Sequence, residues 1–208
     1  MAIDRLYPII DAELLAVRNV SLAAFARELR IAGITLLQYR DKHGSPQEIL
    51  CAAAILREAM AGSWCRLIMN DRADLAILAS FDGVHVGQGD LSPADARRVV
   101  GPNAIVGVST HSDEQVRIAD ESCADSIAIG PVFATGTKPD ASPVVGLEGV
   151  RRARTLTAKP LVAIGGITLA NARSVIDAGA DSVAVISSLF SAGVSTEQVA
   201  RDFLARLR

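Results

Sequence analysis

The stretch DSIAIGPVFATGTKPDASP, residues 125–143, joins a short apolar run to a glycine-rich loop. The run SIAIG, at 126–130, has the length and composition of a β-strand. The loop behind it holds Thr135, Thr137 and Lys138, and Lys138 is one of only three lysines in a chain with eighteen arginines. A scarce cation beside two hydroxyls predicts that this strand ends in a loop that carries chemistry.

The same unit, an apolar run followed by a loop and an amphipathic stretch, recurs along the whole chain. The runs are LYPII (6–10), ITLLQY (34–39), RLIMN (66–70), GVHV (83–86), AIVGVS (104–109), SIAIG (126–130), LVAIG (161–165) and SVAVI (182–186). Alternating strands and helices imply a parallel sheet, and eight units predict a single (β/α)8 TIM barrel over residues 1–208. A doubly wound open sheet is the alternative, which needs fewer strands and a clear topological switch point.

Several helix starts are marked by capping signals. SPQE at 45–48 and SPAD at 92–95 offer a serine cap followed by a first-turn proline. SPQE and SDEQ (112–115) also carry the acid or amide of a capping box. Two strand entries, ESCADSIAI at 121–129 and DAGADSVAV at 177–185, share a layout that a short window also produces by chance.

The composition fits one globular domain, with half of the 208 residues hydrophobic. The apolar runs are too short to span a membrane, and the N-terminus lacks a signal-peptide layout. The odd count of three cysteines, with no CxxC pair, predicts reduced thiols and a cytoplasmic protein. A net charge of −2 with interspersed signs argues against a nucleic-acid partner. We expect Trp64 to lie in the core or between helices, and the sequence leaves a homo-oligomer open.

In a barrel the chemistry lies where the strands end, so the residues after each run are the candidates. Gln38, Arg40 and Lys42 are spaced by two, which places all three on one face of an extended chain. Asn70 and Asp71 close the third run, where a helix cap is the simpler interpretation if they are taken alone.

The next two runs also end in polar residues. Gln88 and Asp90 follow the fourth run, where the glycines alone indicate an ordinary turn. Ser109 and His111 end the fifth run, without a nucleophile elbow or an obvious paired base. Each of these ends is weak evidence by itself, but together they favour a shared polar mouth.

The last two runs end in Gly165-Gly166 and in Ile186-Ser187-Ser188. In many barrels the loops after the seventh and eighth strands bind a phosphate through backbone N–H groups. Glycine permits a close approach of the backbone to phosphate oxygens. We therefore predict a phosphate site here, with two ordinary turns as the alternative.

Charged residues at the other strand ends predict a second, larger anion. Asp71 and Asp90 close successive strands, and magnesium takes one or two protein carboxylates together with water and substrate phosphate. Arg40, Lys42 and Lys138 add positive charge. The set suits a magnesium diphosphate beside a monophosphorylated ligand, and such a diphosphate is a good leaving group. The predicted reaction ionises a carbon–oxygen bond and lets the second ligand attack, although these spacings do not identify either ligand.

Seven motifs occur in order at the expected strand ends: QYRDK, NDRADLA, DGVHVGQGD, VGVSTH, GPVFATGTK, AIGGI and VAVISSLF. Over nearly the whole chain they resemble thiamine phosphate synthases. The resemblance implies a magnesium-dependent transferase that condenses 4-amino-2-methyl-5-(diphosphooxymethyl)pyrimidine with 4-methyl-5-(2-phosphooxyethyl)thiazole. It also implies a dissociative mechanism, in which diphosphate leaves, a pyrimidine carbocation forms and the thiazole nitrogen attacks it to give thiamine phosphate.

The resemblance assigns three sets of contacts, motif by motif. The pyrimidine-diphosphate contacts would be Gln38, Arg40, Lys42, Asn70, Ser109 and Lys138, of which Arg40, Lys42, Ser109 and Lys138 would be catalytic. The magnesium ligands would be Asp71 and Asp90. The thiazole-phosphate contacts would be Thr135, Thr137, Gly166, Ile186 and Ser187.

Other functions stay open at this point. A thiazole tautomerase-like or non-catalytic thiazole-phosphate-binding barrel would resemble the same family without forming a carbon–nitrogen bond. In the tautomerase, His111 would shuttle a proton; otherwise it packs at the mouth. A sugar-phosphate isomerase, epimerase or aldolase on a similar barrel is another alternative. An aldolase would need a lysine buried within a strand, whereas Lys159 precedes Pro160 at a strand entrance. We expect His85 to be a hydrogen-bonded interior residue, and Tyr39 either lines the pyrimidine pocket or faces a helix.

Overall fold

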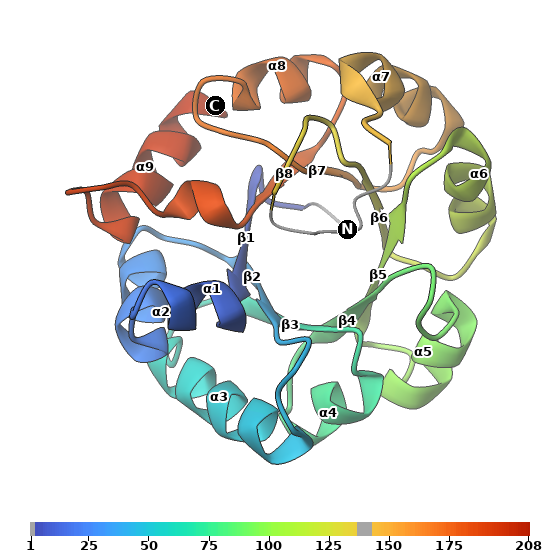
Figure 1. Cartoon of the computed structure of the whole chain (residues 1–208). Helices are drawn as coiled ribbons and strands as arrows, with labels where there is room; N and C mark the ends of the chain where they lie inside the picture. The colour runs from blue at the N-terminus through green and yellow to red at the C-terminus, as the bar shows by residue number, and fades with distance from the viewer. Residues whose placement is uncertain (1–2, 137–142) are drawn as a thin grey trace.

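The computed structural model describes residues 3–136 and 143–208. They form a closed barrel of parallel strands in chain order, and Figure 1 looks along its axis. The strands are β1 (Leu6–Asp11), β2 (Leu36–Arg40), β3 (Arg66–Asn70), β4 (Gly83–Val86), β5 (Ile105–Thr110), β6 (Ser126–Ile129), β7 (Leu161–Ile164) and β8 (Ser182–Val185). Because β1 pairs with β8, the predicted (β/α)8 TIM barrel is confirmed and the open sheet is excluded.

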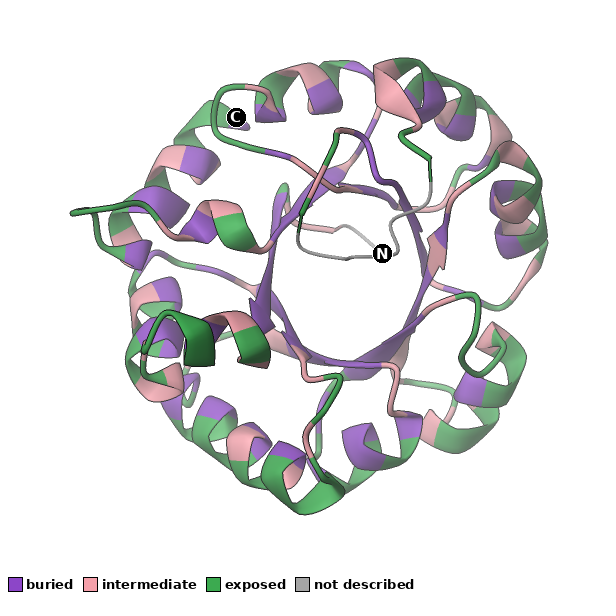
Figure 2. Cartoon of the chain, in the orientation of Figure 1, coloured by how far each residue is buried: buried purple, intermediate pink, exposed green. Residues whose placement is uncertain are grey.

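The helices form a ring around the barrel, with buried faces toward the strands and exposed faces outward (Figure 2). They are α1 (Ala12–Val17), α2 (Leu22–Ile31), α3 (Pro46–Ala59), α4 (Ala73–Leu78), α5 (Pro93–Val100), α6 (Asp113–Glu121), α7 (Gly146–Leu156), α8 (Ala172–Asp177), the 3-10 helix η1 (Ser187–Leu189) and α9 (Thr196–Arg206). Within the described ranges, none of them has the length and apolar character needed to cross a membrane.

The predicted caps form, with one difference. Ser45 and Glu48 make the reciprocal capping box at α3, and Ser92 caps α5. Ser112 caps α6 by accepting a hydrogen bond from the backbone of Gln115. The Gln115 side chain, however, accepts from the backbone N–H of His111 rather than of Ser112. The predicted box at this helix is therefore shifted by one residue.

Strand alternation divides the core into two clusters. The barrel interior is filled by Tyr7, Ile9, Leu36, Ile68, Ala128, Val162 and Ala184. A larger cluster lies between the strands and the helices, and it includes Tyr39. Tyr39 therefore faces the helix layer and its hydroxyl donates to Asp41, whereas its neighbour Gln38 lines an interior cavity.

The N-terminal end of the barrel uses one hydrogen-bonding arrangement three times. An aspartate just before a strand donates its backbone N–H to a residue of the preceding strand, and its carboxylate accepts that residue's N–H. The pairs are Asp82 with Leu67, Asp125 with Val106, and Asp181 with Leu161. Arg97 and Arg154 also bind the second and third of these aspartates. The layout shared by the two ADS strand entries is therefore a repeated structural device.

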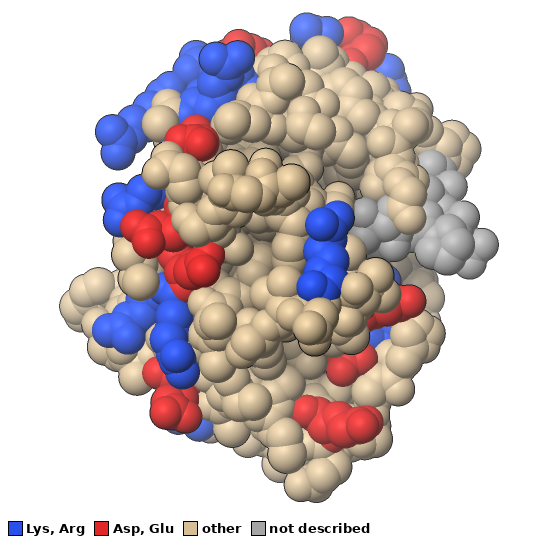
Figure 3. Space-filling model, turned by 60° about the vertical axis from the view of Figure 1, so that its left-hand side comes forward, with Lys and Arg blue, Asp and Glu red and all other residues tan. Residues whose placement is uncertain are grey.

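Two expectations about surface and core residues had different outcomes. The prediction that Trp64 lies in the core or between helices is wrong. Trp64 is 93% exposed, and it lies in the connection between α3 and β3 rather than on a helix or strand that packs into the core. The three cysteines are free, as predicted, and burial raises the pKa of the Cys65 thiol to about 12. Basic and acidic side chains lie next to one another at several places on the face shown in Figure 3.

Candidate active site

The described candidate residues all lie at or just beyond the C-terminal ends of the strands, as predicted. Gln38 and Arg40 are on β2, Lys42 follows β2, Asn70 ends β3, Asp71 follows it, Asp90 follows β4, Ser109 is on β5, Thr135 follows β6, Gly166 follows β7, and Ile186 and Ser187 follow β8. Thr137 and Lys138 lie outside the described residues. Residues from seven strand ends therefore meet at one mouth.

Two adjoining cavities open at this mouth. The larger, of about 150 Å³, lies between the ends of β5 to β8, and its lining includes Ser109, His111, Thr135, Gly166, Ile186 and Ser187. The smaller, of about 30 Å³, lies in the barrel interior, and its lining includes Gln38, Arg40, Asn70, His85, Ser109 and Ile186. Because Ser109 and Ile186 line both, ligands bound in these cavities would lie next to each other.

Arg40 is held in position by a carboxylate that the sequence analysis missed. Asp11, at the end of β1, accepts a hydrogen bond from the Leu14 backbone and caps α1. Its other oxygen accepts from Arg40 Nη1, and both side chains are largely buried. Arg40 Nε is also buried, but it has no partner among the described residues. Asp11 follows an apolar run as Asp71 does, so the rule applied to the other strand ends would have found it.

Asn70, which lines the smaller cavity, carries a second unused donor. Its Nδ2 atom is buried and has no hydrogen-bond partner within the described part of the chain. Buried polar groups are nearly always paired, so an orphaned one at a cavity indicates a ligand. The helix-cap interpretation of Asn70 and Asp71 is wrong, because the N-cap of α4 is Arg72 and no side chain caps that helix.

Gln38 completes the polar wall of the smaller cavity. It is 2% exposed, and its Nε2 donates to the Tyr7 hydroxyl at 3.1 Å. Burial raises the pKa of Tyr7, so that phenol stays protonated at neutral pH. The pair is therefore a neutral hydrogen bond inside the barrel.

Asp71 and Asp90 meet above the ends of β3 and β4. Asp71 has a left-handed backbone with φ of 61°, and its carboxylate accepts a hydrogen bond from Lys42 Nζ. Burial raises the pKa of Asp71; Lys42 opposes this shift, whereas the adjacent Asp90 adds to it. Asp90 also accepts the Gly87 N–H at 2.8 Å, so the turn expected here forms and the carboxylate closes it.

This carboxylate pair fits a magnesium ion with few protein ligands. The two side chains are close enough to interact directly, and no group of three or more His, Cys, Asp or Glu residues in the described ranges is arranged to hold a metal. Magnesium commonly binds one or two carboxylates and fills its shell with water and substrate phosphate. The donor set therefore suits a metal that is shared with a diphosphate.

Ser109 is positioned by residues of β4 and its loop. His85 Nε2 lies 2.9 Å from Ser109 Oγ, and Gln88 Nε2 donates to the Ser109 carbonyl at 2.6 Å. A Cβ on Gly107 would lie 2.4 Å from His85 Nδ1, so glycine makes room for the ring. His85 is thus a hydrogen-bonded interior residue, as predicted, and it orients the hydroxyl that lies between the two cavities.

The glycine pair after β7 shapes the larger cavity by packing against the loop after β6. Gly165 and Gly166 have φ of 101° and 64°. A Cβ on Gly166 would lie 2.5 Å from the Ala134 carbonyl, and the Phe133 N–H donates to the Gly165 carbonyl at 3.0 Å. Glycine is therefore required here for contact between two loops, and that contact places Thr135 beside the cavity.

The residues that the alternative functions would use are also located. His111 Nδ1 lies 2.6 Å from the Gly130 carbonyl, so the ring packs at the cavity mouth. Lys159 lies at the opposite end of the barrel, where its ammonium binds the carbonyls of Ala119 and Ser122. No described strand carries the buried lysine that a Schiff-base aldolase would need.

A family model and two relatives of similar sequence share one activity in their names. The sequence profile described as thiamine monophosphate synthase matches residues 6–189. The thiamine-phosphate synthase of Koribacter versatilis (strain Ellin345) is 55% identical over 206 residues, which cover 98% of this chain and 96% of that protein. The thiamine-phosphate synthase of Chloroflexus aurantiacus (strain ATCC 29366 / DSM 635 / J-10-fl) is 44% identical over 188 residues, 90% of this chain and 86% of that protein.

Solved structures agree with the sequence matches. Thiamine phosphate pyrophosphorylase from Pyrococcus furiosus superposes with a TM-score of 0.86 at 32% identity, covering 98% of this chain and 95% of that one. A tryptophan synthase α-subunit mutant from the same organism has a TM-score of 0.70 at 14% identity, covering 100% and 99% of the two chains. The second likeness shows the barrel fold alone.

Proposed function

We propose that this chain condenses 4-amino-2-methyl-5-(diphosphooxymethyl)pyrimidine with 4-methyl-5-(2-phosphooxyethyl)thiazole. The chain belongs to the thiamine monophosphate synthase family, whose name gives this activity. The products are thiamine phosphate and diphosphate. The observation that carries the proposal is the pair of adjoining cavities that share Ser109 and Ile186. Two ligands that must form a bond with each other need binding sites that lie side by side.

The pyrimidine binds at the open side of the smaller cavity, which at about 30 Å³ is too small to enclose the ring, and its diphosphate is directed toward the mouth. Arg40, held by Asp11, offers its buried Nε, and Asn70 offers its Nδ2, which has no partner among the described residues. Asp71 and Asp90 would hold magnesium, which would supply positive charge to stabilise the diphosphate as a leaving group. Both electrons of the carbon–oxygen bond leave with the diphosphate. The positive charge remains on the methylene carbon of the pyrimidine, which the thiazole nitrogen then attacks.

The larger cavity takes the thiazole phosphate. Its lining includes Thr135, Gly166, Ile186 and Ser187, which are the contacts that the family resemblance assigns. Ser109 stands between the two cavities with its hydroxyl oriented by His85, where it faces both reacting groups. Thr137 and Lys138 belong to the same proposal, Thr137 for the thiazole phosphate and Lys138 for the diphosphate.

Product formation tests the proposal directly. The purified protein is mixed with both substrates in the presence of magnesium or of excess chelator, and thiamine phosphate is followed by chromatography. We expect product only with magnesium. If folded protein gives no product with magnesium or manganese, the synthase assignment fails. Thiazole isomerisation by the same sample would then support the tautomerase, and binding without turnover would support a thiazole-phosphate sensor.

A further inference from the structure

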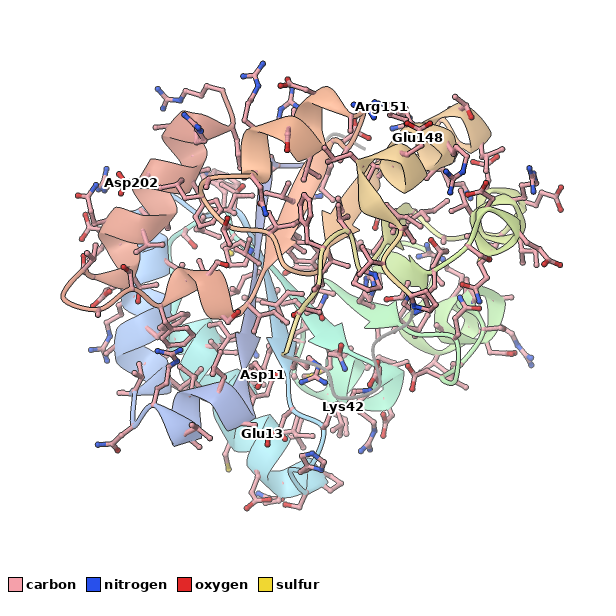
Figure 4. All side chains as sticks on the ribbon, turned by 45° about the horizontal axis from the view of Figure 1, so that its top comes forward. Asp11, Glu13, Lys42, Glu148, Arg151 and Asp202 are labelled. Atoms are coloured by element: carbon pink, nitrogen blue, oxygen red, sulfur yellow. The ribbon has the colours of Figure 1, made fainter. Side chains whose placement is uncertain are left out.

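The two cations at the mouth of β2 are held in different ways. Arg40 is largely buried and is bound to Asp11, whose side chain is 5% exposed. Lys42 is bound to Asp71, but its own side chain is 40% exposed. Asp11 and Lys42 are both labelled in Figure 4, near the ends of β1 and β2. Arg40 is therefore a fixed donor, whereas the exposed side chain of Lys42 has room to change its partner.

The loop that carries Lys42 is anchored by its neighbour. Asp41 accepts hydrogen bonds from the backbone N–H groups of His43 and Gly44, at 3.1 and 2.7 Å. The Tyr39 hydroxyl donates to the same Asp41 carboxylate at 3.3 Å. Because the backbone is held on both sides of Lys42, a change of partner requires movement of its flexible four-carbon side chain alone.

Asp71, in contrast, is held firmly at the end of β3. Its backbone N–H donates to the His85 carbonyl at 2.7 Å, and its own carbonyl accepts from Ala73 at 3.1 Å. The carboxylate oxygen that accepts from Lys42 belongs to the pair that fits magnesium. An ammonium group and a divalent ion cannot both occupy the same side of one carboxylate oxygen, because their charges repel and their positions overlap.

We propose that Lys42 competes with the divalent metal for Asp71 and exchanges this carboxylate for the diphosphate when the metal diphosphate binds. The inference rests on the proposed function, because it concerns the order in which that reaction's ligands enter. The lysine lowers the affinity of the free enzyme for metal alone and raises its affinity for metal and diphosphate together. The metal is thereby retained mainly as the diphosphate complex that reacts.

The test measures both affinities in the variant Lys42→Met, which keeps the length of the side chain and removes its charge. Manganese binding to the protein alone is followed by the loss of the EPR signal of free Mn²⁺. We expect the dissociation constant to fall by about fivefold, the value of one exposed ion pair. Inorganic diphosphate binding at saturating magnesium is followed by calorimetry, and we expect it to weaken by about fivefold or more.

Arg72→Met is the matched control. Arg72 is the next residue after Asp71, but its guanidinium pairs with Asp74. The control removes the same unit charge from the same region without breaking the Lys42–Asp71 contact. We expect both of its affinities to stay within about twofold of the wild type, because an exposed ion pair makes a small contribution. An equal gain in manganese affinity in both variants would mean a general charge effect and would overturn the proposal.

Two other results would also overturn it: unchanged manganese affinity in Lys42→Met, or a gain in manganese affinity without weaker diphosphate binding. Lys42→Gln repeats the measurement with a shorter neutral side chain and excludes an effect of the methionine itself. The wild-type product assay separates this proposal from the proposed function. If the wild type makes thiamine phosphate and Lys42→Met binds manganese no better, the function stands and the competition is wrong. If the affinities change as expected but no product forms, the function fails and the competition stands.

Discussion

The two ends of the barrel differ in whether their buried polar groups have hydrogen-bond partners. At the N-terminal end, Asp82, Asp125 and Asp181 exchange hydrogen bonds with the preceding strand. At the C-terminal end, Arg40 Nε and Asn70 Nδ2 are buried without a partner among the described residues. A paired group adds a little stability, whereas an unpaired buried group costs more than a pair gains. One end is therefore built to hold the fold, and the other keeps donors for a ligand.

Arginines show the same contrast within a single residue type. Arg97 binds Asp125 and also donates to the backbone carbonyls of Gly101 and Ala104. Arg40 binds Asp11 and leaves Nε unused within the described residues. Arg97, which joins structural elements, donates to several acceptors of the protein. Arg40, at the site, has one donor that remains available for a ligand.

The largest expected effect comes from removing the unpaired Asn70 donor at the C-terminal end of the barrel. Asn70→Leu keeps the size of the side chain and removes the amide. We expect kcat/KM to fall by about 100-fold or more, because a donor to the reacting ligand is lost. The free energy of unfolding, measured in urea, should stay the same or rise, because no internal hydrogen bond is broken. A large loss of stability with unchanged kcat/KM would show that Asn70 belongs to the fold and would break the comparison.

Gly166→Ala tests a residue that serves both the fold and the site. Alanine is strained at φ of 64° and its Cβ would lie 2.5 Å from the Ala134 carbonyl. We expect a loss of about 2–3 kcal/mol in the free energy of unfolding, together with a higher KM for the thiazole phosphate. Gly193→Ala is the control, because φ is 73° but nothing lies near the added Cβ. Its expected loss is about 1 kcal/mol, and equal losses in both variants would mean that loop contact contributes nothing.

At the N-terminal end, Asp181→Ala removes the acceptor for the Leu161 N–H and the partner of Arg154. We expect a loss of about 1–2 kcal/mol in the free energy of unfolding, because a backbone donor loses its partner. The kcat/KM measured below the unfolding transition should not change. Asp177→Ala, which breaks the exposed pair with Arg173, should cost less than about 0.5 kcal/mol. Lower kcat/KM in folded Asp181→Ala would contradict the separation of roles.

The smallest expected effect is on stability, at a buried unpaired group that lies at the N-terminal end of the barrel. Ser182, on β8 near the N-terminal end, is fully buried and its Oγ has no partner within the described residues. Ser182→Ala should therefore raise the free energy of unfolding by roughly 0.5–1 kcal/mol. Thr110→Val has the opposite expectation, a loss of about 1 kcal/mol, because it removes the hydrogen bond to the Ala128 carbonyl. Destabilisation by Ser182→Ala would show that this hydroxyl has a partner after all.

Local sequence patterns were sufficient for the elements of the fold. RLIMN and GVHV coincide with β3 and β4 residue for residue, because a buried parallel strand is a continuous apolar run. The serine caps at 45, 92 and 112 were equally local and equally clear. Trp64 shows the limit of such patterns, since a large apolar side chain does not reveal whether anything covers it.

The connections within the site could not be predicted in this way. Arg40 and Asp11 are 29 residues apart, as are Lys42 and Asp71. Such pairs depend on which strands become neighbours and in what register, and neither is visible in a window of sequence. The strand-end rule placed Asp71 at the mouth, but only the folded barrel shows that Lys42 is its partner.

The pairing of β1 with β8 has a consequence for how the chain is made. A ribosome completes β1 first and β8 last, so the outer edge of β1 has no partner until residues Ser182–Val185 have emerged. Exposed strand edges invite pairing with other chains, and long-range contacts such as this form late. Helix α9 then packs next to α2: the Glu197 N–H donates to the Glu28 carboxylate, and Arg201 donates to the Ile31 carbonyl. The barrel therefore closes only after β8 has been made, and the nascent chain has no complete mouth before that point.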